Sequence, residues 1–212
     1  MSTATTRAPA TRRDARTERT RRALTEAALR RFADQGYDAT TVDQLAAEVG
    51  VTQRTFFHHF PTKEAVLFGG YEERFQEATA AFRDAAQSGT LADGLHAATT
   101  ALMTAIEAQR ELFLVRGQLY RETPALRATM LRLNDDWIEN VAFVVAERLG
   151  VDADTDVGPR LAATTANGAN RVAIDLWTAS GGRLDLSALA DDAFRAIRPA
   201  IDTIEREAGR AR

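Results

Sequence analysis

The sequence predicts an all-α protein of about nine helices, in which a small three-helix domain is followed by a larger helical bundle. Nearly every long segment places apolar residues at helical spacing, and glycines or prolines stand where these segments should end. No segment shows the alternation of apolar and polar residues that a half-buried strand requires. The 212 residues, 45% hydrophobic and 27% charged, have the composition of a soluble globular protein rather than a disordered or fibrous one.

Composition excludes several kinds of site. The chain has no cysteine, which removes disulfides, iron–sulfur clusters, a thiolate nucleophile and cysteine-rich zinc sites. No apolar run approaches the roughly 18 residues that a membrane span needs. Residues 2–22 contain no Leu, Ile, Val, Phe, Tyr or Trp from which a signal peptide could be built. We therefore expect a cytoplasmic protein without membrane contact.

Charge is segregated along the chain. Residues 1–63 contain 11 Lys and Arg against 7 Asp and Glu, a net charge of +4. Residues 64–212 contain 16 against 23, a net charge of −7. A small basic part joined to a larger acidic part suggests that the first meets a polyanion and the second does not.

The first elements are an arm and a helix. Residues 1–17 are rich in Thr, Ala and Arg without apolar periodicity, and they predict a flexible arm. A helix is expected from about 18 to 35, with Gly36 as its stop. Its apolar face holds Leu24, Ala28 and Phe32.

Three further helices are expected before Gly89, each beginning at a threonine that can cap its first turn. The spacing from Thr41 to Gln44 fits a capping box. These helices are expected at 41–50, 52–61 and 62–88.

The rest of the chain predicts long bundle helices. Breaks are expected at Gly89, around Arg110, at Thr123-Pro124, from Gly150 to Thr155 and at Gly181-Gly182. The helices between these breaks are expected at 91–109, 110–122, 124–149, 156–180 and 186–208.

Residues 41–60, TVDQLAAEVGVTQRTFFHHF, predict a helix-turn-helix. Phe56 and Phe60 lie four apart on the buried side of its second helix. The exposed side of that helix presents Gln53, Arg54, Phe57 and His58. Such a helix enters the major groove by its N-terminal end, where glutamine can pair with adenine and arginine with guanine. The alternative is an ordinary helical hairpin with solvated polar residues, which the basic charge of this part disfavours.

A longer motif covers residues 28–67, A-x-x-x-F-A-x-x-G-Y-x-A-T-T-V-x-x-L-A-x-x-x-G-V-T-x-x-T-F-F-x-H-F-x-x-K-E-A-V-L. It resembles the N-terminal domain of the TetR family of transcriptional regulators. Beyond it, the chain shares only the length and helical character of that family. The resemblance implies a homodimeric repressor, bound to a palindromic operator on double-stranded DNA, whose C-terminal bundle binds a small molecule and thereby loosens the grip on DNA.

Carried over to this chain, the resemblance implies phosphate contacts by Thr41 and Lys63 and base reading by residues 52–60. The aromatic residue at Phe57 is commonly tyrosine in the family, so a phosphate contact by a hydroxyl is absent here. Van der Waals contact with a sugar or a thymine methyl group is expected instead. The predicted DNA-binding residues are Thr41, Thr52, Gln53, Arg54, Thr55, Phe57, His58 and Lys63.

The domains then follow as an arm (1–17), a helix-turn-helix domain (18–63) and a ligand-binding and dimerisation domain (64–212). The arginines at 7, 12, 13, 16, 19, 21 and 22 either touch phosphates or the minor groove, or form a solvated tail. His58 and His59 point about 100° apart on a helix, so they cannot chelate one metal ion. No HExxH metalloprotease motif, GxGxxG motif or Walker sequence is present, and we expect no cofactor, no metal and no enzyme activity.

The last two helices predict a dimer interface. One apolar stripe holds Leu161, Thr165, Gly168, Val172 and Leu176, and another holds Leu186, Leu189, Phe194, Ile197, Ile201 and Ile204. Two such helices from each subunit would form a four-helix interface, as the family resemblance also implies. The alternative is that both stripes face the core of their own subunit.

A ligand site requires aromatic walls and a few polar groups. The candidates near apolar stripes are Phe113, Arg116, Tyr120, Asn134, Trp137, Asn167, Asn170 and Arg171. Arg116 and Arg171 would suit an anionic or carbonyl-bearing ligand if they point inward. For each residue alone, a core or surface role is the alternative. Two other functions stay open at this point: a DNA-binding protein without an effector, and a helical enzyme with a structural N-terminal hairpin.

Overall fold

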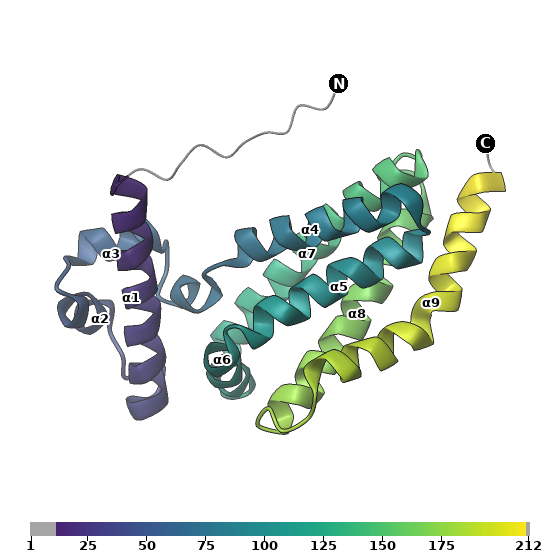
Figure 1. Cartoon of the computed structure of the whole chain (residues 1–212). Coiled ribbons are helices and arrows are strands. Elements are labelled where there is room, and N and C mark those ends of the chain that lie inside the picture. Colours follow the sequence, from purple (N-terminus) through teal and green to yellow (C-terminus); the bar gives the residue numbers. More distant parts are fainter. Residues whose placement is uncertain (1–11, 211–212) are drawn as a thin grey trace. The chain divides into compact units, whose positions relative to one another are not determined.

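The computed structural model describes residues 12–210, which form nine α-helices and one 3₁₀-helix (Figure 1). No strand occurs in this range, so the all-α prediction is confirmed. The chain divides into two compact units between Gly69 and Gly70. None of the helices within 12–210 is both long enough and apolar enough to cross a membrane.

The N-terminal unit packs three α-helices and the 3₁₀-helix around a small aromatic core. Its elements are α1 (Arg12–Gln35), α2 (Val42–Val49), α3 (Gln53–His59) and η1 (Glu64–Phe68). Leu24, Phe32, Leu45, Phe56 and Phe60 are at most 2% exposed and hold the elements together by apolar burial.

The first helix begins earlier than the sequence predicts. Residues 12–17, expected as part of the arm, form the first turns of α1. Extending a nucleated helix adds one hydrogen bond per residue and needs no apolar face, so the absence of periodicity did not exclude it. The rest of the predicted arm, residues 1–11 with Arg7, lies outside the described residues.

The fourth predicted helix, 62–88, is wrong as a single element. It is split into η1 and α4 (Tyr71–Ser88), because Gly69 ends η1 and Gly70, whose φ of 75° suits glycine, precedes the first turn of α4. Val66 and Leu67 on η1 are fully buried, and the Thr25 hydroxyl of α1 donates to the Val66 carbonyl at 3.4 Å. The predicted boundary at residues 63 and 64 therefore moves to Gly69 and Gly70, because η1 completes the core of the N-terminal unit.

The C-terminal unit is a six-helix bundle whose breaks agree with the predicted ones to within two residues. Its helices are α4, α5 (Leu91–Glu107), α6 (Arg110–Glu122), α7 (Pro124–Leu149), α8 (Val157–Ala179) and α9 (Leu186–Arg210). Figure 1 shows α4 beside α5 and α8 beside α9. One core lies among α4, α5, α7, α8 and α9, and a second, around Trp177, lies among α5, α6, α8 and α9.

The predicted dimer stripe on α9 lies in the core of its own subunit instead. Leu186, Phe194 and Ile201 are at most 2% exposed, Ile204 is buried and Ile197 packs on the same core. The strong amphipathicity of α9 is thus satisfied by α5 and α8 within one chain.

The predicted stripe on α8 is different, because it faces outward. Leu161, Val172 and Leu176 are each about half exposed (50%, 55% and 49%). A Cβ added at Gly168, between them, would meet no atom of residues 12–210 within 4 Å apart from its chain neighbours and the backbone of its own helix. This exposed set, with Thr165 half-buried beside it, is called the α8 face below.

Candidate DNA-binding surface and ligand cavity

The second helix of the helix-turn-helix, α3, is anchored by its aromatic residues. Phe56 and Phe60 lie in the core with ring centroids 5.6 Å apart. Thr52 caps the helix, since its hydroxyl accepts from the Thr55 amide at 3.1 Å. The cap and the two buried rings fix which side of α3 faces solvent.

The solvent side of α3 carries the predicted base-reading residues. Gln53, Arg54 and His58 are exposed, and the ring of Phe57 is 46% exposed. Within residues 12–210, Gln53 and Arg54 have no hydrogen-bond or ion-pair partner, so both are free to bind another molecule. Thr55 is only half exposed, and its hydroxyl lies 2.9 Å from that of Thr52.

The helix before it is fixed by a complete capping box. The Thr41 hydroxyl accepts from the Gln44 amide at 3.2 Å, and the Gln44 side chain accepts from the Thr41 amide at 2.9 Å. Glu48 near the other end of α2 pairs with Arg30 and Arg31 of α1, and hydrogen bonds from Arg31 and then Arg30 hold its pKa below the ordinary value. Both ends of α2 are therefore fixed relative to α1 or to its own first turn.

Lys63 has an internal role in this structure. Its ammonium donates to the carbonyls of Tyr37 at 2.8 Å and Thr40 at 3.0 Å, and lies 3.9 Å from the centre of the Tyr37 ring. Two of its three N–H groups thus hold the loop between α1 and α2. The predicted phosphate contact is left with at most one N–H, and it stays a prediction.

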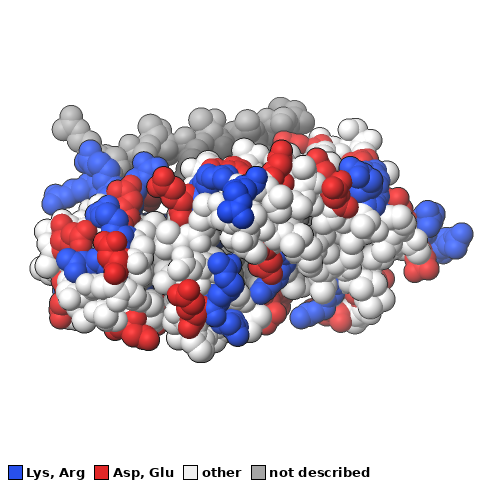
Figure 2. Space-filling view, turned by 90° about the horizontal axis from the view of Figure 1, so that it is seen from below, with Lys and Arg blue, Asp and Glu red and all other residues white. Residues whose placement is uncertain are grey.

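Charge on the described surface is mixed. On the face drawn in Figure 2, basic and acidic side chains are interspersed without a large area of one sign. Arg16, Arg19 and Arg22 on α1 are exposed. With Arg54 on α3, these arginines are exposed basic residues of α1 and α3 that a DNA contact could use.

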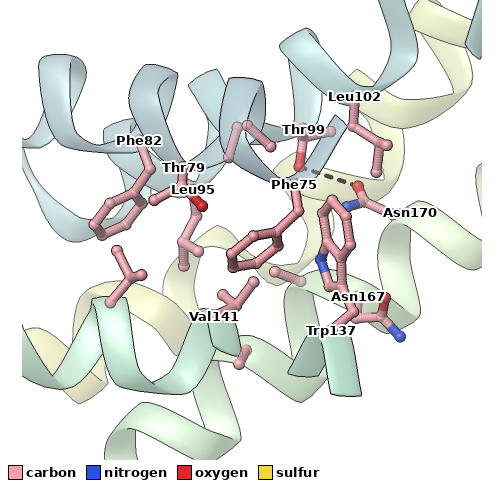
Figure 3. A pocket seen from close by; sticks show the side chains of 15 residues that line it. Phe75, Thr79, Phe82, Leu95, Thr99, Leu102, Trp137, Val141, Asn167 and Asn170 are labelled. Atoms are coloured by element: carbon pink, nitrogen blue, oxygen red, sulfur yellow. Dashed lines mark hydrogen bonds between the residues drawn. The ribbon is translucent and has the colours of Figure 1, made fainter. Parts of the chain in front are cut away.

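In the C-terminal unit, a cavity of about 30 Å³ lies among α4, α5, α7 and α8 (Figure 3). Its walls are aromatic, aliphatic and small, with four uncharged polar side chains among them. The lining residues are Phe75, Ala78, Thr79, Phe82, Leu95, Ala98, Thr99, Leu102, Trp137, Val141, Val144, Ala163, Ala166, Asn167 and Asn170.

Two features of the cavity wall stand out. The Thr99 hydroxyl donates to Asn170 Oδ1 at 3.0 Å, and both residues are buried. The Trp137 ring meets Tyr71 and Phe75 edge to face, with centroids 5.4 and 5.1 Å apart. The cavity thus combines a buried polar pair with a half-buried indole.

The helix-turn-helix and the cavity-bearing bundle each match a known kind of domain. Residues 24–68 match the family described as bacterial regulatory proteins, tetR family, and residues 89–202 match the MftR C-terminal domain. The HTH-type transcriptional regulator TcmR from Streptomyces glaucescens is 32% identical over 95% of this chain and 96% of its own. The chain belongs to the TetR family.

Other comparisons agree with this TetR-family assignment. The transcriptional regulator MftR from Mycobacterium tuberculosis is 27% identical over 73% of this chain and 77% of its own. The crystal structure of Thermus thermophilus FadR in complex with lauroyl-CoA has a TM-score of 0.55 at 22% identity, covering 82% of this chain and 91% of that one, and shows the same fold. The relatives are transcriptional regulators rather than enzymes, which removes the enzyme alternative.

Three of the eight predicted ligand residues of this TetR-family protein line the cavity: Trp137, Asn167 and Asn170. Five do not: Phe113, Arg116, Tyr120, Asn134 and Arg171. The reason is that α6 packs on the second core, where Phe113 and Arg116 are buried with the guanidinium 3.7 Å from the ring centre. Burial, and then repulsion from Arg74, lower the pKa of Arg116.

Arg171 is likewise directed elsewhere. Its guanidinium donates to the Tyr120 hydroxyl at 2.7 Å and lies 3.5 Å from an Asp175 carboxylate oxygen. Neither arginine lines this cavity. The expectation that they would suit an anionic or carbonyl-bearing ligand required them to point inward, and it stays a prediction.

The contribution of α4 and α5 to the cavity was missed. Phe75, Thr79 and Phe82 recur at helical spacing on α4, and Leu95, Thr99 and Leu102 do so on α5. That periodicity was the available signal, but it marks a buried face without telling whether the face meets a cavity or solid core. Within residues 12–210 no cluster of three or more possible metal ligands is found.

Proposed function

We propose that this TetR-family regulator is a homodimeric repressor that binds a palindromic operator with α3 of each subunit and releases it when a small molecule enters the cavity. The observation that carries the proposal is the exposed side of α3, where Gln53 and Arg54 have no partner among residues 12–210. The buried rings of Phe56 and Phe60 anchor the helix, and these two side chains are not needed for that anchoring. Their freedom suits direct reading of bases.

The base contacts follow from side-chain chemistry. Arg54 supplies two parallel donors that match guanine O6 and N7, and the Gln53 amide matches adenine N6 and N7. The half-exposed ring of Phe57 suits a thymine methyl group or a sugar. We expect phosphate contacts from Thr41 and Thr52, which cap the N-terminal ends of α2 and α3, because phosphates bind favourably at helix N-termini.

Assembly is proposed to use the α8 face. About half of each of Leu161, Val172 and Leu176 is exposed, and the open space at Gly168 would let a partner helix approach closely. The exposed residues of α9 include the small Ala196, Pro199 and Ala200, with the charged Asp192 and Arg195 also exposed on this helix. Pairing two copies of α8 and α9 would bury the apolar surface and hold two α3 helices for two half-sites.

The effector role is proposed for the cavity among α4, α5, α7 and α8. The FadR complex with lauroyl-CoA is one case in which a structure of this fold carries a small-molecule ligand. A ligand that favours the released state of the dimer by about 1 to 3 kcal/mol would weaken operator binding roughly 5- to 150-fold. A regulator that binds DNA without an effector is the alternative.

A mobility-shift titration with the DNA flanking the protein's own gene tests the proposal. We expect a retarded band at protein concentrations at least 1,000-fold below those that shift random DNA of equal length. A reporter under the flanking promoter should rise when the gene is deleted. Equal affinity for flanking and random DNA contradicts operator recognition, and a falling reporter contradicts repression.

A further inference from the structure

The cavity in the C-terminal unit has a wall without any charge. None of its 15 lining residues is acidic or basic. Bringing an ionised ligand group into such an interior without a counter-charge costs several kcal/mol. The wall therefore selects an uncharged ligand.

The side-chain amide of Asn170 in this wall is held in one orientation but has hydrogen-bonding capacity left over. Asn170 is 8% exposed, and its Oδ1 accepts from the Thr99 hydroxyl at 3.0 Å. Its Nδ2 has no hydrogen-bond partner among residues 12–210. Because Thr99 holds the amide oxygen, the amide N–H₂ is left to donate to an acceptor that enters the cavity.

The rest of the wall favours a flat ring. Figure 3 shows the side chains of Phe75, Phe82 and Trp137 around the cavity, and the Trp137 ring lies at 78° to the Tyr71 ring and at 86° to the Phe75 ring. Such rings pack well on a planar aromatic ligand.

The cavity must grow to admit such a ligand. Its volume of about 30 Å³ matches roughly one water molecule. A single benzene ring occupies an interior cavity of about 150 Å³. Trp137 is half-buried rather than fully enclosed, so we expect the wall to open by outward displacement of this side chain.

We propose that the cavity binds an uncharged, flat aromatic molecule carrying a carbonyl oxygen, which accepts a hydrogen bond from Asn170 Nδ2, and that it rejects an anion of the same shape. This ligand class rests on the effector role proposed above for the cavity. It keeps the carbonyl-bearing ligand of the two that the sequence suggested and drops the anionic one, since neither Arg116 nor Arg171 lines the cavity.

Three probes of similar shape separate the effect of the hydrogen-bond acceptor from the effect of a negative charge on binding. 2-Acetylnaphthalene carries the acceptor, 2-ethylnaphthalene lacks it and 2-naphthoate carries a charge. Binding to the full-length protein without DNA is measured by calorimetry at neutral pH. We expect 2-acetylnaphthalene to bind about 5- to 10-fold more tightly than 2-ethylnaphthalene, as one neutral hydrogen bond implies, and 2-naphthoate to bind at least about 100-fold more weakly.

Asn170→Leu should abolish the preference for the acetyl over the ethyl probe while both still bind. Thr99→Val removes only the hydroxyl that orients the Asn170 amide, and it should reduce the preference for the acetyl probe. This variant still tests the ligand class if Asn170→Leu does not fold. Failure of all three probes to bind, tight binding of 2-naphthoate, or an unchanged preference in folded Asn170→Leu overturns the ligand class.

The same probes separate this inference from the proposed switch. If 2-acetylnaphthalene binds as expected but operator affinity does not change, the ligand class stands and the effector role fails. If another small molecule releases the operator while the naphthalenes do not bind, the effector role stands and the ligand class fails.

Discussion

Lys63 and Tyr37 are joined twice, through a hydrogen bond of 2.8 Å from the ammonium to the Tyr37 carbonyl and through the ammonium lying 3.9 Å from the ring centre. The same ammonium also holds the Thr40 carbonyl at 3.0 Å. The loop that precedes α2, and with it Thr41, is thus positioned by a side chain that the family motif assigns to DNA contact.

Lys63→Ala should therefore destabilise the N-terminal unit. Loss of two charge-assisted hydrogen bonds and one cation–π contact predicts a decrease of about 1 to 3 kcal/mol in the free energy of unfolding. Operator binding should weaken alike for all sequences. Denaturant unfolding followed by circular dichroism checks the first effect, and unchanged stability with weakened DNA binding would make Lys63 a phosphate contact alone.

Thr99 and Asn170 form the buried pair in the cavity wall, and we expect substitutions at these two positions to have non-additive effects on stability. Thr99→Val leaves Asn170 Oδ1 without its donor and should cost about 1 to 3 kcal/mol. Adding Asn170→Leu should recover part of that loss, because both polar partners are then gone. Thr100→Val, at an exposed position one residue away, is the control and should change stability by less than about 0.5 kcal/mol. If the losses of unfolding free energy in the two single variants add up to the loss in the double variant, the two side chains do not act as a pair.

Acid stability should depend on Asp93. Its carboxylate accepts from the Thr90 amide at 3.0 Å and from Arg198 at 2.6 Å, and these bonds lower its pKa from 3.8 to about 2. A carboxyl whose pKa is lower in the folded state stabilises the fold above its unfolded pKa. That contribution is lost as the pH falls from about 4 to about 2.

Asp93→Asn should thus lower the melting temperature at pH 5, and the difference from wild type should shrink as the pH approaches 2. Asp135→Asn, at an exposed carboxylate without a partner among residues 12–210, is the control. A difference that stays constant from pH 5 to pH 2 would show that the Asp93 charge does not stabilise the fold.

The outward direction of the α8 face predicts where the dimer can be broken. Val172→Asp or Leu176→Asp should yield folded monomers, because an unpaired carboxylate in a buried seam costs several kcal/mol. Leu131→Asp, on an equally exposed leucine of α7, should remain a dimer. Ile201→Asp should instead unfold the bundle, since Ile201 is fully buried. Light scattering with circular dichroism distinguishes the cases, and a folded Val172→Asp dimer contradicts the assignment.

Local signals made the helices predictable. The capping boxes at Thr41 and Thr90 and the stops at Gly50 and Gly150 act within one turn, so they are legible in sequence. Whether the apolar face of a helix points into the bundle or outward depends on contacts with residues distant in sequence. Periodicity marks α8 and α9 alike as amphipathic, yet α9 turns its stripe inward and α8 turns its stripe outward.

The same limit applies to the two candidate sites. The exposed side of α3 follows from the spacing of Phe56 and Phe60, so the exposure of Gln53 and Arg54 was predictable. The bond from Lys63 to a loop distant in sequence was not. The cavity is formed by four helices, so the sequence of any one helix does not indicate which of its polar residues lines the cavity. Arg116 and Asn170 are both polar residues on apolar faces, but only Asn170 reaches the cavity.

Arg54 gives the most direct test of the account. Wild type and Arg54→Ala are titrated against a set of operators with every base pair of one half-site substituted in turn. Because Arg54 has no partner among residues 12–210, its removal should leave stability unchanged, weaken operator binding by about 1 to 3 kcal/mol and remove the preference at one base pair per half-site. An Arg54→Ala protein that keeps the wild-type affinity and the wild-type preference at every base pair would contradict base reading by α3.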